Sequence, residues 1–150
     1  MGKIRQGLQG KKVYFDANIF IYTLEGIAPW DVELKDVFSG LLAGEFSAVT
    51  SSLSLAECLV LPFRQNKIDL VKTYREALLP SYYLDVVPIN DRILLSTAKT
   101  RAQINLKLPD AIHATTALTQ KCTTILTNDT DFSRVPNIEL FLLSDWISPC

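Results

Sequence analysis

The chain has 150 residues, of which 48% are hydrophobic and 21% are charged, which fits one soluble globular domain and excludes a disordered chain. The formal net charge is −1, which excludes binding to nucleic acid through bulk positive charge. A polyanion would therefore have to be held by a local basic patch or a bound cation. No apolar run approaches the roughly 20 residues that cross a bilayer, and no apolar core of a signal peptide follows the N-terminus.

Domain organisation and cysteine usage are equally simple. We expect a single domain over residues 1–150, with a polar leader at 1–11 and a tail at 144–150. Cys58, Cys122 and Cys150 are odd in number, far apart and without metal-ligand spacing. They are interpreted as reduced thiols of a cytoplasmic protein.

The first half of the chain alternates short strands with amphipathic helices. Residues 13–15 have the apolar character of a buried parallel strand that stops at Asp16, and 18–24 predict a short helix packed on the sheet. The next helix opens at Pro29 and ends before Gly44, and its expected apolar stripe comprises Val32, Leu34, Val37, Phe38, Leu41 and Leu42. Residues 46–50 predict a second strand. Ser51 or Ser52 then caps a helix that is expected to end at Pro62, with Leu53, Leu55, Ala56, Leu59 and Val60 on its apolar face.

The second half continues the alternation. It predicts helices at 69–79, from Asn90 or Asp91 to about 105, and from Pro109 to 120, with strands at 84–88, 122–127 and 138–143. Pro109 suits the first turn of its helix, because its missing N–H has no partner there in any case. Strands that alternate with helices predict a three-layer α/β/α sandwich with a central parallel sheet of four to five strands.

Carboxylates stand where these elements begin and end. Asp16 and Asp129 follow strands, Asp110 lies in a first helical turn, and Glu57 comes about two turns after a strand. Because ligands gather at the carboxyl ends of parallel strands where the strand order reverses, we expect these four acids at one edge of the sheet. Asp131 is a possible fifth member. Two unit charges 4 Å apart repel by about 4 kcal/mol at an effective dielectric constant near 20, a large fraction of the roughly 5–15 kcal/mol that stabilises a domain.

Such a cluster must separate, take up protons or bind cations. Carboxylates without thiolates and with one histidine favour Mg²⁺ or Mn²⁺ over zinc. Each acid also has a structural explanation on its own: a turn or helix cap at Asp16, a capping box with Ser54 at Glu57, dipole stabilisation at Asp110, and turn formation at Asp129 and Asp131. Their joint placement favours the functional interpretation.

Basic residues and the single histidine are less informative. His113 lies one turn after Asp110 and is interpreted as a packed or solvent-facing imidazole, with a general base as the alternative. Lys99, Arg101 and Lys107 precede Asp110, where they either contact phosphates or form a solvated helix face.

Four segments together resemble a known family. V-Y-F-D-A-N-I-F at 13–20, S-L-A-E at 54–57, L-P-D-A-I-H-A at 108–114 and T-N-D-T-D-F at 127–132 resemble a PIN domain. Within that family the chain is most similar to the VapC-type toxins of toxin–antitoxin pairs, from Val13 to about Leu143. The resemblance implies a Mg²⁺- or Mn²⁺-dependent endoribonuclease that cuts RNA, often tRNA or rRNA, by attack of water on phosphorus without a covalent enzyme intermediate.

The resemblance also implies site residues and partners. Asp16, Glu57, Asp110 and Asp129 match the acidic quartet, with Asp16 and Asp110 as direct metal ligands and Glu57 and Asp129 completing the site or ordering water. Asn18 and Thr127 match supporting polar positions, and Asp131 stands where acids occur less regularly. A homodimer and a cognate antitoxin are implied as partners, the antitoxin offering Arg to the carboxylates.

Two other functions remain open at this point. A haloacid-dehalogenase-like phosphatase would use Asp16 as nucleophile, but such enzymes place an acid two residues later, where this chain has Asn18. A catalytically silent PIN module would act as a protein- or RNA-binding partner, although a complete quartet speaks against lost activity.

Overall fold

The computed structural model describes residues 1–147, which form five strands, eight α-helices and one 3-10 helix. The strands are β1 (Lys12–Phe15), β2 (Ser47–Ser51), β3 (Leu84–Val87), β4 (Thr124–Thr127) and β5 (Glu139–Leu142). The helices are α1 (Lys3–Gly7), α2 (Ala17–Leu24), α3 (Trp30–Leu42), α4 (Leu53–Arg64), α5 (Ile68–Ala77), α6 (Asp91–Gln103), α7 (Leu108–Thr119), α8 (Leu143–Trp146) and the 3-10 helix η1 (Thr130–Arg134).

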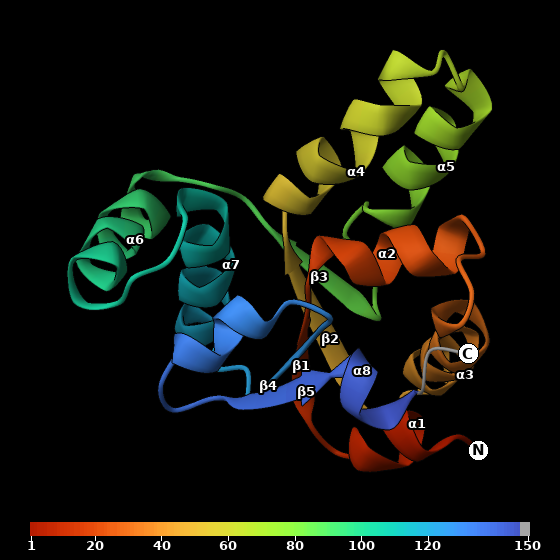
Figure 1. The fold of residues 1–150 in the computed structure, drawn as a ribbon, viewed down its shortest axis with the longest axis horizontal. Coiled ribbons are helices and arrows are strands. Elements are labelled where there is room, and N and C mark those ends of the chain that lie inside the picture. The colour runs from red at the N-terminus through yellow and green to blue at the C-terminus, as the bar shows by residue number, and fades with distance from the viewer. Residues whose placement is uncertain (148–150) are drawn as a thin grey trace.

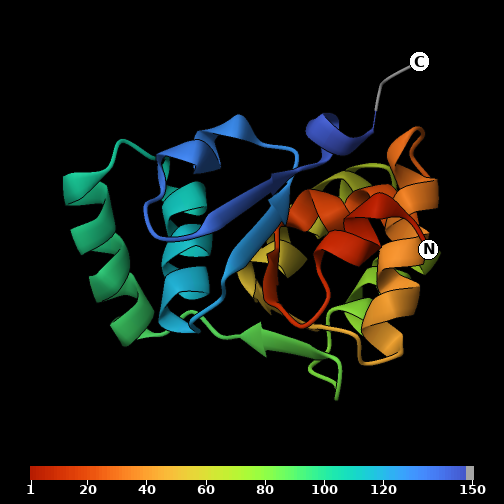
Figure 2. The same ribbon diagram turned by 90° about the horizontal axis from the view of Figure 1, so that it is seen from below.

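The five strands form one parallel sheet in the order β3-β2-β1-β4-β5. The chain moves from β1 outward through β2 to β3 and then returns to place β4 on the other side of β1 (Figure 1). The strand order therefore reverses between β1 and β4. Helices α6 and α7 lie on one side of the sheet and α2, α3, α4 and α5 on the other (Figures 1 and 2), which confirms the predicted three-layer sandwich.

Successive residues of the central strands face opposite layers, because side chains alternate along a strand. In β1, Val13 and Phe15 enter the core shared with α2 and α3, whereas Tyr14 enters the core shared with α7. The same alternation divides Ala48 from Val49 in β2 and Leu126 from Ile125 in β4. Tyr14 is thereby placed on the side of the sheet that α7 covers.

The N-terminal segment is more than the polar leader that the sequence suggested. Residues Lys3–Gly7 form α1, and Ile4 and Leu8 are fully buried in the main core. Arg5 fixes the helix to its surroundings through bonds of 2.9 Å to Asp36 and 2.7 Å to Glu45. The helix was not predicted because charged and polar residues surround Ile4, its one buried residue.

Truncating Leu8 should therefore destabilise the fold. Leu8→Ala removes a fully buried side chain, and such changes lower the free energy of unfolding by about 2–5 kcal/mol. Lys3→Ala, an exposed position in the same helix, should stay within about 0.5 kcal/mol of the parent. Urea denaturation measures both variants, and equal stability of the two would contradict a core role for α1.

The remaining elements agree with the predicted strands to within two residues but differ in details of the helices. Helix α4 continues past the buried Pro62 to Arg64, because the ring of proline suits helical φ and only one backbone bond is lost near the helix end. Val32, Leu42 and Val60, which were assigned to apolar faces, are 72%, 52% and 48% exposed. None of the helices within residues 1–147 has the length and hydrophobicity that crossing a bilayer requires.

The C-terminal tail is partly helical, and the two described cysteines are buried. Residues Leu143–Trp146 form α8, and Trp146 stacks on Phe141 with 5.1 Å between ring centroids. Cys58 and Cys122 are buried free thiols, as expected, whereas Cys150 lies outside the described residues. Burial raises the pKa of the Cys58 thiol to about 12 and that of Cys122 to about 11, so both stay protonated.

Candidate functional site

Asp16 lies at the carboxyl end of β1, where the strand order reverses. It is also the N-cap of α2: its Oδ1 accepts a hydrogen bond from the backbone N–H of Ala17 at 2.8 Å. Its Oδ2 accepts a second bond from the hydroxyl of Thr127 at 2.7 Å. Only 8% of the residue is exposed. The helix cap and the place in the acidic cluster therefore belong to one buried carboxylate, whose two oxygens accept from Ala17 and Thr127.

Thr127 connects Asp16 to Asp129 across the two central strands. Its hydroxyl donates to Asp16 and accepts from the backbone N–H of Asp129 at 3.0 Å. Asp129 in turn caps η1, with its Oδ1 accepting from the N–H of Asp131 at 2.9 Å. Two residues that lie 113 positions apart in the chain are thus held by one buried threonine at the switch point of the sheet.

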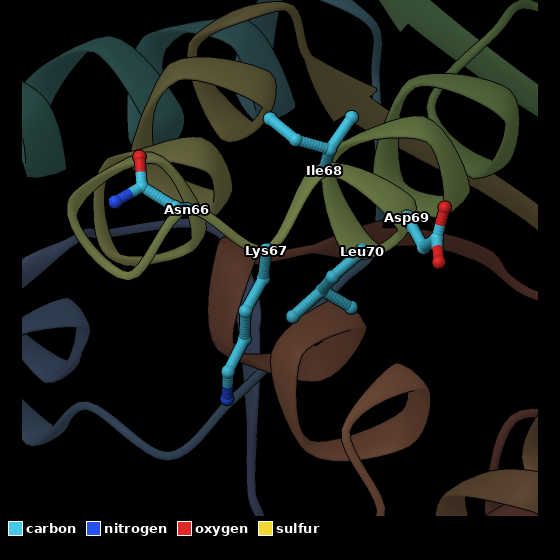
Figure 3. A pocket seen from close by; sticks show the side chains of 5 residues that line it. All are labelled: Asn66, Lys67, Ile68, Asp69 and Leu70. Carbon is cyan, nitrogen blue, oxygen red and sulfur yellow. The ribbon is translucent and has the colours of Figure 1, made fainter.

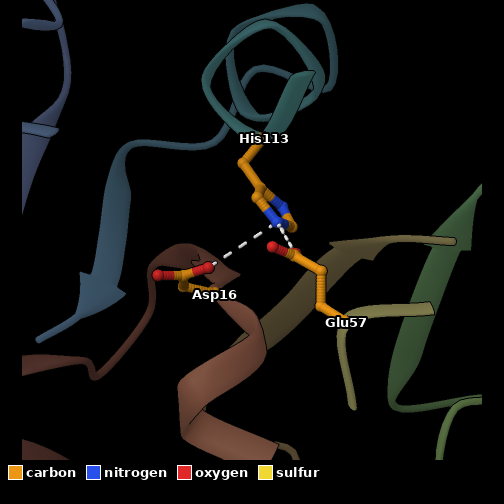
Figure 4. A group of neighbouring side chains, drawn as sticks. All are labelled: Asp16, Glu57 and His113. Atoms are coloured by element: carbon orange, nitrogen blue, oxygen red, sulfur yellow. Dashed lines mark hydrogen bonds and ion pairs between the residues drawn. The ribbon is translucent and has the colours of Figure 1, made fainter. Parts of the chain in front are cut away.

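Glu57 reaches the same edge from α4 and meets His113 of α7 there (Figure 4). The Nε2 atom of His113 lies 2.5 Å from Glu57 Oε1 and 3.7 Å from Asp16 Oδ1. The other ring nitrogen, Nδ1, lies 2.6 Å from the hydroxyl of Tyr14. His113 is therefore a packed imidazole, one of the two environments expected for it, and it bonds to Glu57 of another helix.

The five acids of this cluster fall into two groups, one of which includes His113. Ligand atoms of Asp16, Glu57 and His113 lie within 4.8 Å of one another, and so do those of Asp110, Asp129 and Asp131. Asp131 also pairs with Arg134 at 3.6 Å, which partly neutralises it. The Ser54–Glu57 capping box is absent, because α4 begins earlier and Ser54 bonds to Thr50 instead.

The cluster is electrostatically strained without a cation. Burial raises the pKa of Asp16, and the nearby imidazole and the Thr127 bond counteract this only in part. Burial, together with the charges of Asp129 and Asp16, raises the pKa of Asp110 to about 6. Burial acts to lower the pKa of His113, but the bond to Glu57 and the surrounding carboxylates raise it above its usual value. Without a cation, the fold therefore disfavours the ionised forms of Asp16 and Asp110.

The stability of the metal-free protein should consequently fall as the pH rises from about 4.5 to 6. Asp110 binds its proton more tightly in the folded chain, with a pKa of about 6, than in the unfolded chain, with a pKa of about 4, so its contribution is full at low pH and lost through pH 6. Glu45, whose pKa the Arg5 bond lowers to about 2, acts only below this window. Urea denaturation after chelation measures the trend, and a flat or rising profile would contradict the crowding of charge.

The donor set fits a hard divalent cation. Carboxylate oxygens dominate it, as Mg²⁺ and Mn²⁺ prefer, and the described residues offer no thiolate beside them. Asn18 supplies a further sign: its buried Oδ1 finds no hydrogen-bond donor among residues 1–147. A water molecule of a hydrated ion would satisfy such an atom.

One residue of this site, Tyr14, was not expected from the sequence. Tyr14 had been treated only as part of an apolar strand, yet its hydroxyl bonds to His113. A signal was present, because a buried tyrosine needs a hydrogen-bond partner and its neighbours in the strand are apolar. Lys99, Arg101 and Lys107 are exposed, and Arg101 donates to the backbone carbonyl of Leu106 at 3.1 Å.

A pocket elsewhere on the surface does not include the acids. Asn66, Lys67, Ile68, Asp69 and Leu70 line it at the turn between α4 and α5 (Figure 3). This turn is the far end of the two-helix projection in Figure 1, whereas Glu57 lies on α4 nearer the sheet. The clustered acids and His113 lie at the edge of the sheet and not in this pocket.

Solved structures that share this fold include toxin–antitoxin complexes and a free toxin. No curated protein matches the chain. Among solved structures, VapBC2 from Rickettsia felis bound to a DNA fragment from its promoter has 20% identity over 87% of this chain and 98% of its own, with a TM-score of 0.65. A toxin–antitoxin complex from Klebsiella pneumoniae has 24% identity over 84% of this chain and 94% of its own, with a TM-score of 0.62. Mycobacterium tuberculosis VapC20, described as a sarcin–ricin loop cleaving toxin, has 15% identity over 85% of this chain and 97% of its own, with a TM-score of 0.68.

At such low identity these structures establish a shared fold. The family profile of the PIN domain, in contrast, matches the sequence itself over residues 13–138. This range runs from the second residue of β1 past the end of η1 and includes every acid of the cluster described above. The chain therefore belongs to the PIN domain family.

Proposed function

We propose that this chain is a divalent-metal-dependent endoribonuclease and the toxin of a toxin–antitoxin pair. The observation that carries the proposal is the meeting of acids from distant segments at one edge of the sheet. Asp16 and Asp129 end the adjacent strands β1 and β4, and Glu57 and Asp110 approach from α4 and α7. Membership of the PIN family and the likeness to VapC toxins support nuclease chemistry.

The same four acids are the proposed catalytic and metal-binding residues. Asp16 and Asp110 serve as direct ligands of Mg²⁺ or Mn²⁺. Burial is the main cause that raises both pKa values, and a bound cation would favour the ionised carboxylates. Glu57 and Asp129 complete the site or order water. Thr127 and Asn18 support it, the first through its bond to Asp16. Asp131 plays a lesser part, since Arg134 already pairs with it.

Cleavage of RNA would use a bound cation together with Glu57, Asp16 and Thr127. A bound cation would lower the pKa of an attacking water and offset the charge that grows on the phosphate oxygens. The Glu57 side chain is 35% exposed, so it can orient that water from the open side of the site. Thr127 holds Asp16 in place during the reaction, and displacement at phosphorus needs no covalent bond to the enzyme.

An antitoxin and a second copy of the chain are the proposed protein partners. The Rickettsia felis and Klebsiella pneumoniae structures are themselves toxin–antitoxin assemblies. An antitoxin side chain of arginine would suit the acidic site, because its planar fork pairs with carboxylates in two places. Exposed apolar side chains supply surface for such contacts, among them Leu61, Phe63 and Ile68 near the turn between α4 and α5 and Leu94 and Leu95 on α6.

Purified protein incubated with total RNA tests the proposal. Cleavage with Mg²⁺ or Mn²⁺ that stops on addition of EDTA is the expected result, with tRNA and rRNA fragments identified by sequencing of their ends. Hydrolysis of a small phosphate ester with intact RNA would instead indicate the phosphatase. Absence of turnover, with retention of a partner protein or RNA, would indicate a silent PIN module.

A further inference from the structure

His113 stands out because both of its ring nitrogens are engaged within the core. It is 1% exposed and is the one histidine in the sequence. Nε2 faces the carboxylates of Glu57 and Asp16, and Nδ1 faces the hydroxyl of Tyr14. By distance alone, His113 could serve as a metal ligand beside Asp16 and Glu57.

The neighbours of the ring decide where its proton sits. Tyr14 is fully buried, and a phenol, with an ordinary pKa of about 10, carries its proton at neutral pH. A buried hydroxyl proton needs an acceptor, and Nδ1 lies 2.6 Å away. A neutral ring that accepts at Nδ1 carries its own proton on Nε2.

The contact with Glu57 also indicates a proton on Nε2. An ionised carboxylate only accepts hydrogen bonds, so the contact of 2.5 Å between Glu57 Oε1 and Nε2 needs a proton on the nitrogen. A doubly protonated imidazolium would also carry that proton. In both charge states of the ring, the Nε2 lone pair is therefore unavailable to a metal.

We propose that His113 is a positioning residue that holds the Glu57 carboxylate by donating its Nε2–H, and that it is not a metal ligand. This inference rests on the proposed function, because that proposal places Glu57 in the metal site. Because the hydrogen bonds from Tyr14 to His113 and from His113 to Glu57 occupy both ring nitrogens, only carboxylate oxygens remain as ligands for a metal ion. Such a set favours Mg²⁺ or Mn²⁺ and disfavours Zn²⁺, which imidazole suits.

Nitrogen NMR of the ring tests the proton position directly. The ¹⁵N-labelled full chain contains one histidine, so long-range ¹H–¹⁵N signals of the imidazole belong to His113 without assignment. The nitrogen coupled to both carbon-bound ring protons, Nε2, should have the shift of a protonated nitrogen without metal and keep it on titration with MgCl₂. An unprotonated Nε2, or one that loses its proton as Mg²⁺ binds, would overturn the proposal.

Two substitutions test the positioning role through Mg²⁺ affinity measured by calorimetry. His113→Leu removes the donor and should weaken Mg²⁺ binding by about 10- to 100-fold, the usual effect of losing a group that orients a ligand. His113→Gln places an amide N–H near the position of Nε2 and should recover part of the loss. Unchanged binding by folded His113→Leu, or equal loss in both folded variants, would overturn the assignment.

The fold of each variant is checked by circular dichroism, and the parent's NMR result stands even where a variant does not fold. These measurements also separate the two proposals. The parent protein could have a protonated Nε2 and bind Mg²⁺ and still leave RNA intact. That result would refute the proposed nuclease activity, whereas the proposed role of His113 would stand.

Discussion

Asp16→Asn should lower the rate of Mg²⁺-dependent RNA cleavage by at least about 100-fold, the effect of removing one preorganised electrostatic group from an active site. Asparagine has nearly the same shape and retains one oxygen to accept from Thr127 or Ala17. What it lacks is the negative charge and the second oxygen that a cation would bind. The loss of activity should therefore come from chemistry and not from a rearranged strand end.

The thermal stability of Asp16→Asn shows whether activity is lost through metal-binding chemistry or through a rearranged strand end. Because burial raises the pKa of Asp16, the ionised side chain is an unfavourable group in the metal-free fold. Asp16→Asn should unfold at the same temperature as the metal-free parent or at a higher one. Asp91→Asn, which changes an exposed acid in the first turn of α6, is the matched control and should cleave RNA at the parent rate. Full activity in Asp16→Asn would refute the proposed site.

The sheet and the placement of the acids could be predicted because both follow from local patterns. Val13 to Phe15 and Thr124 to Thr127 are short apolar or β-branched runs, and each is followed closely by an aspartate. Parallel strands then bring Asp16 and Asp129 to one edge without any further information. This part of the site follows from strand order alone.

The hydrogen bonds that organise the site could not be predicted in the same way. Tyr14 and His113 lie 99 positions apart, and Glu57 and His113 lie 56 apart, so their contacts depend on how α4 and α7 pack. His113 lies one turn after Asp110 in the sequence, whereas its imidazole bonds to Tyr14 of β1 and Glu57 of α4. Helix α1 was not predicted for a related reason, since one buried residue in a five-residue helix gives no periodic signal.

Asp110→Asn should make the metal-free protein more stable and at the same time remove its stabilisation by Mg²⁺. Two effects of the Asp110 charge oppose each other. Its place in the first turn of α7 favours a negative charge by about 0.3–1 kcal/mol. Burial and the charges of Asp129 and Asp16 disfavour it, as the pKa of about 6 shows. A shift from about 4 to about 6, reduced for solvent screening, leaves repulsion ahead by about 1 kcal/mol.

Thermal unfolding at pH 8 measures both effects. In the parent, Mg²⁺ at 100 times its dissociation constant should add about 2.7 kcal/mol, or roughly 5–10 °C in Tm. Asp110→Asn should start about 2–4 °C higher without metal and gain little from Mg²⁺. Asp69→Asn in the first turn of α5 is the matched control: the exposed acid has the same dipole environment without the cluster, so its loss should leave Tm unchanged or lower it. If Asp110→Asn lowered the metal-free Tm as well, the helix dipole would outweigh the repulsion, and the acids at this edge would not need a cation to coexist.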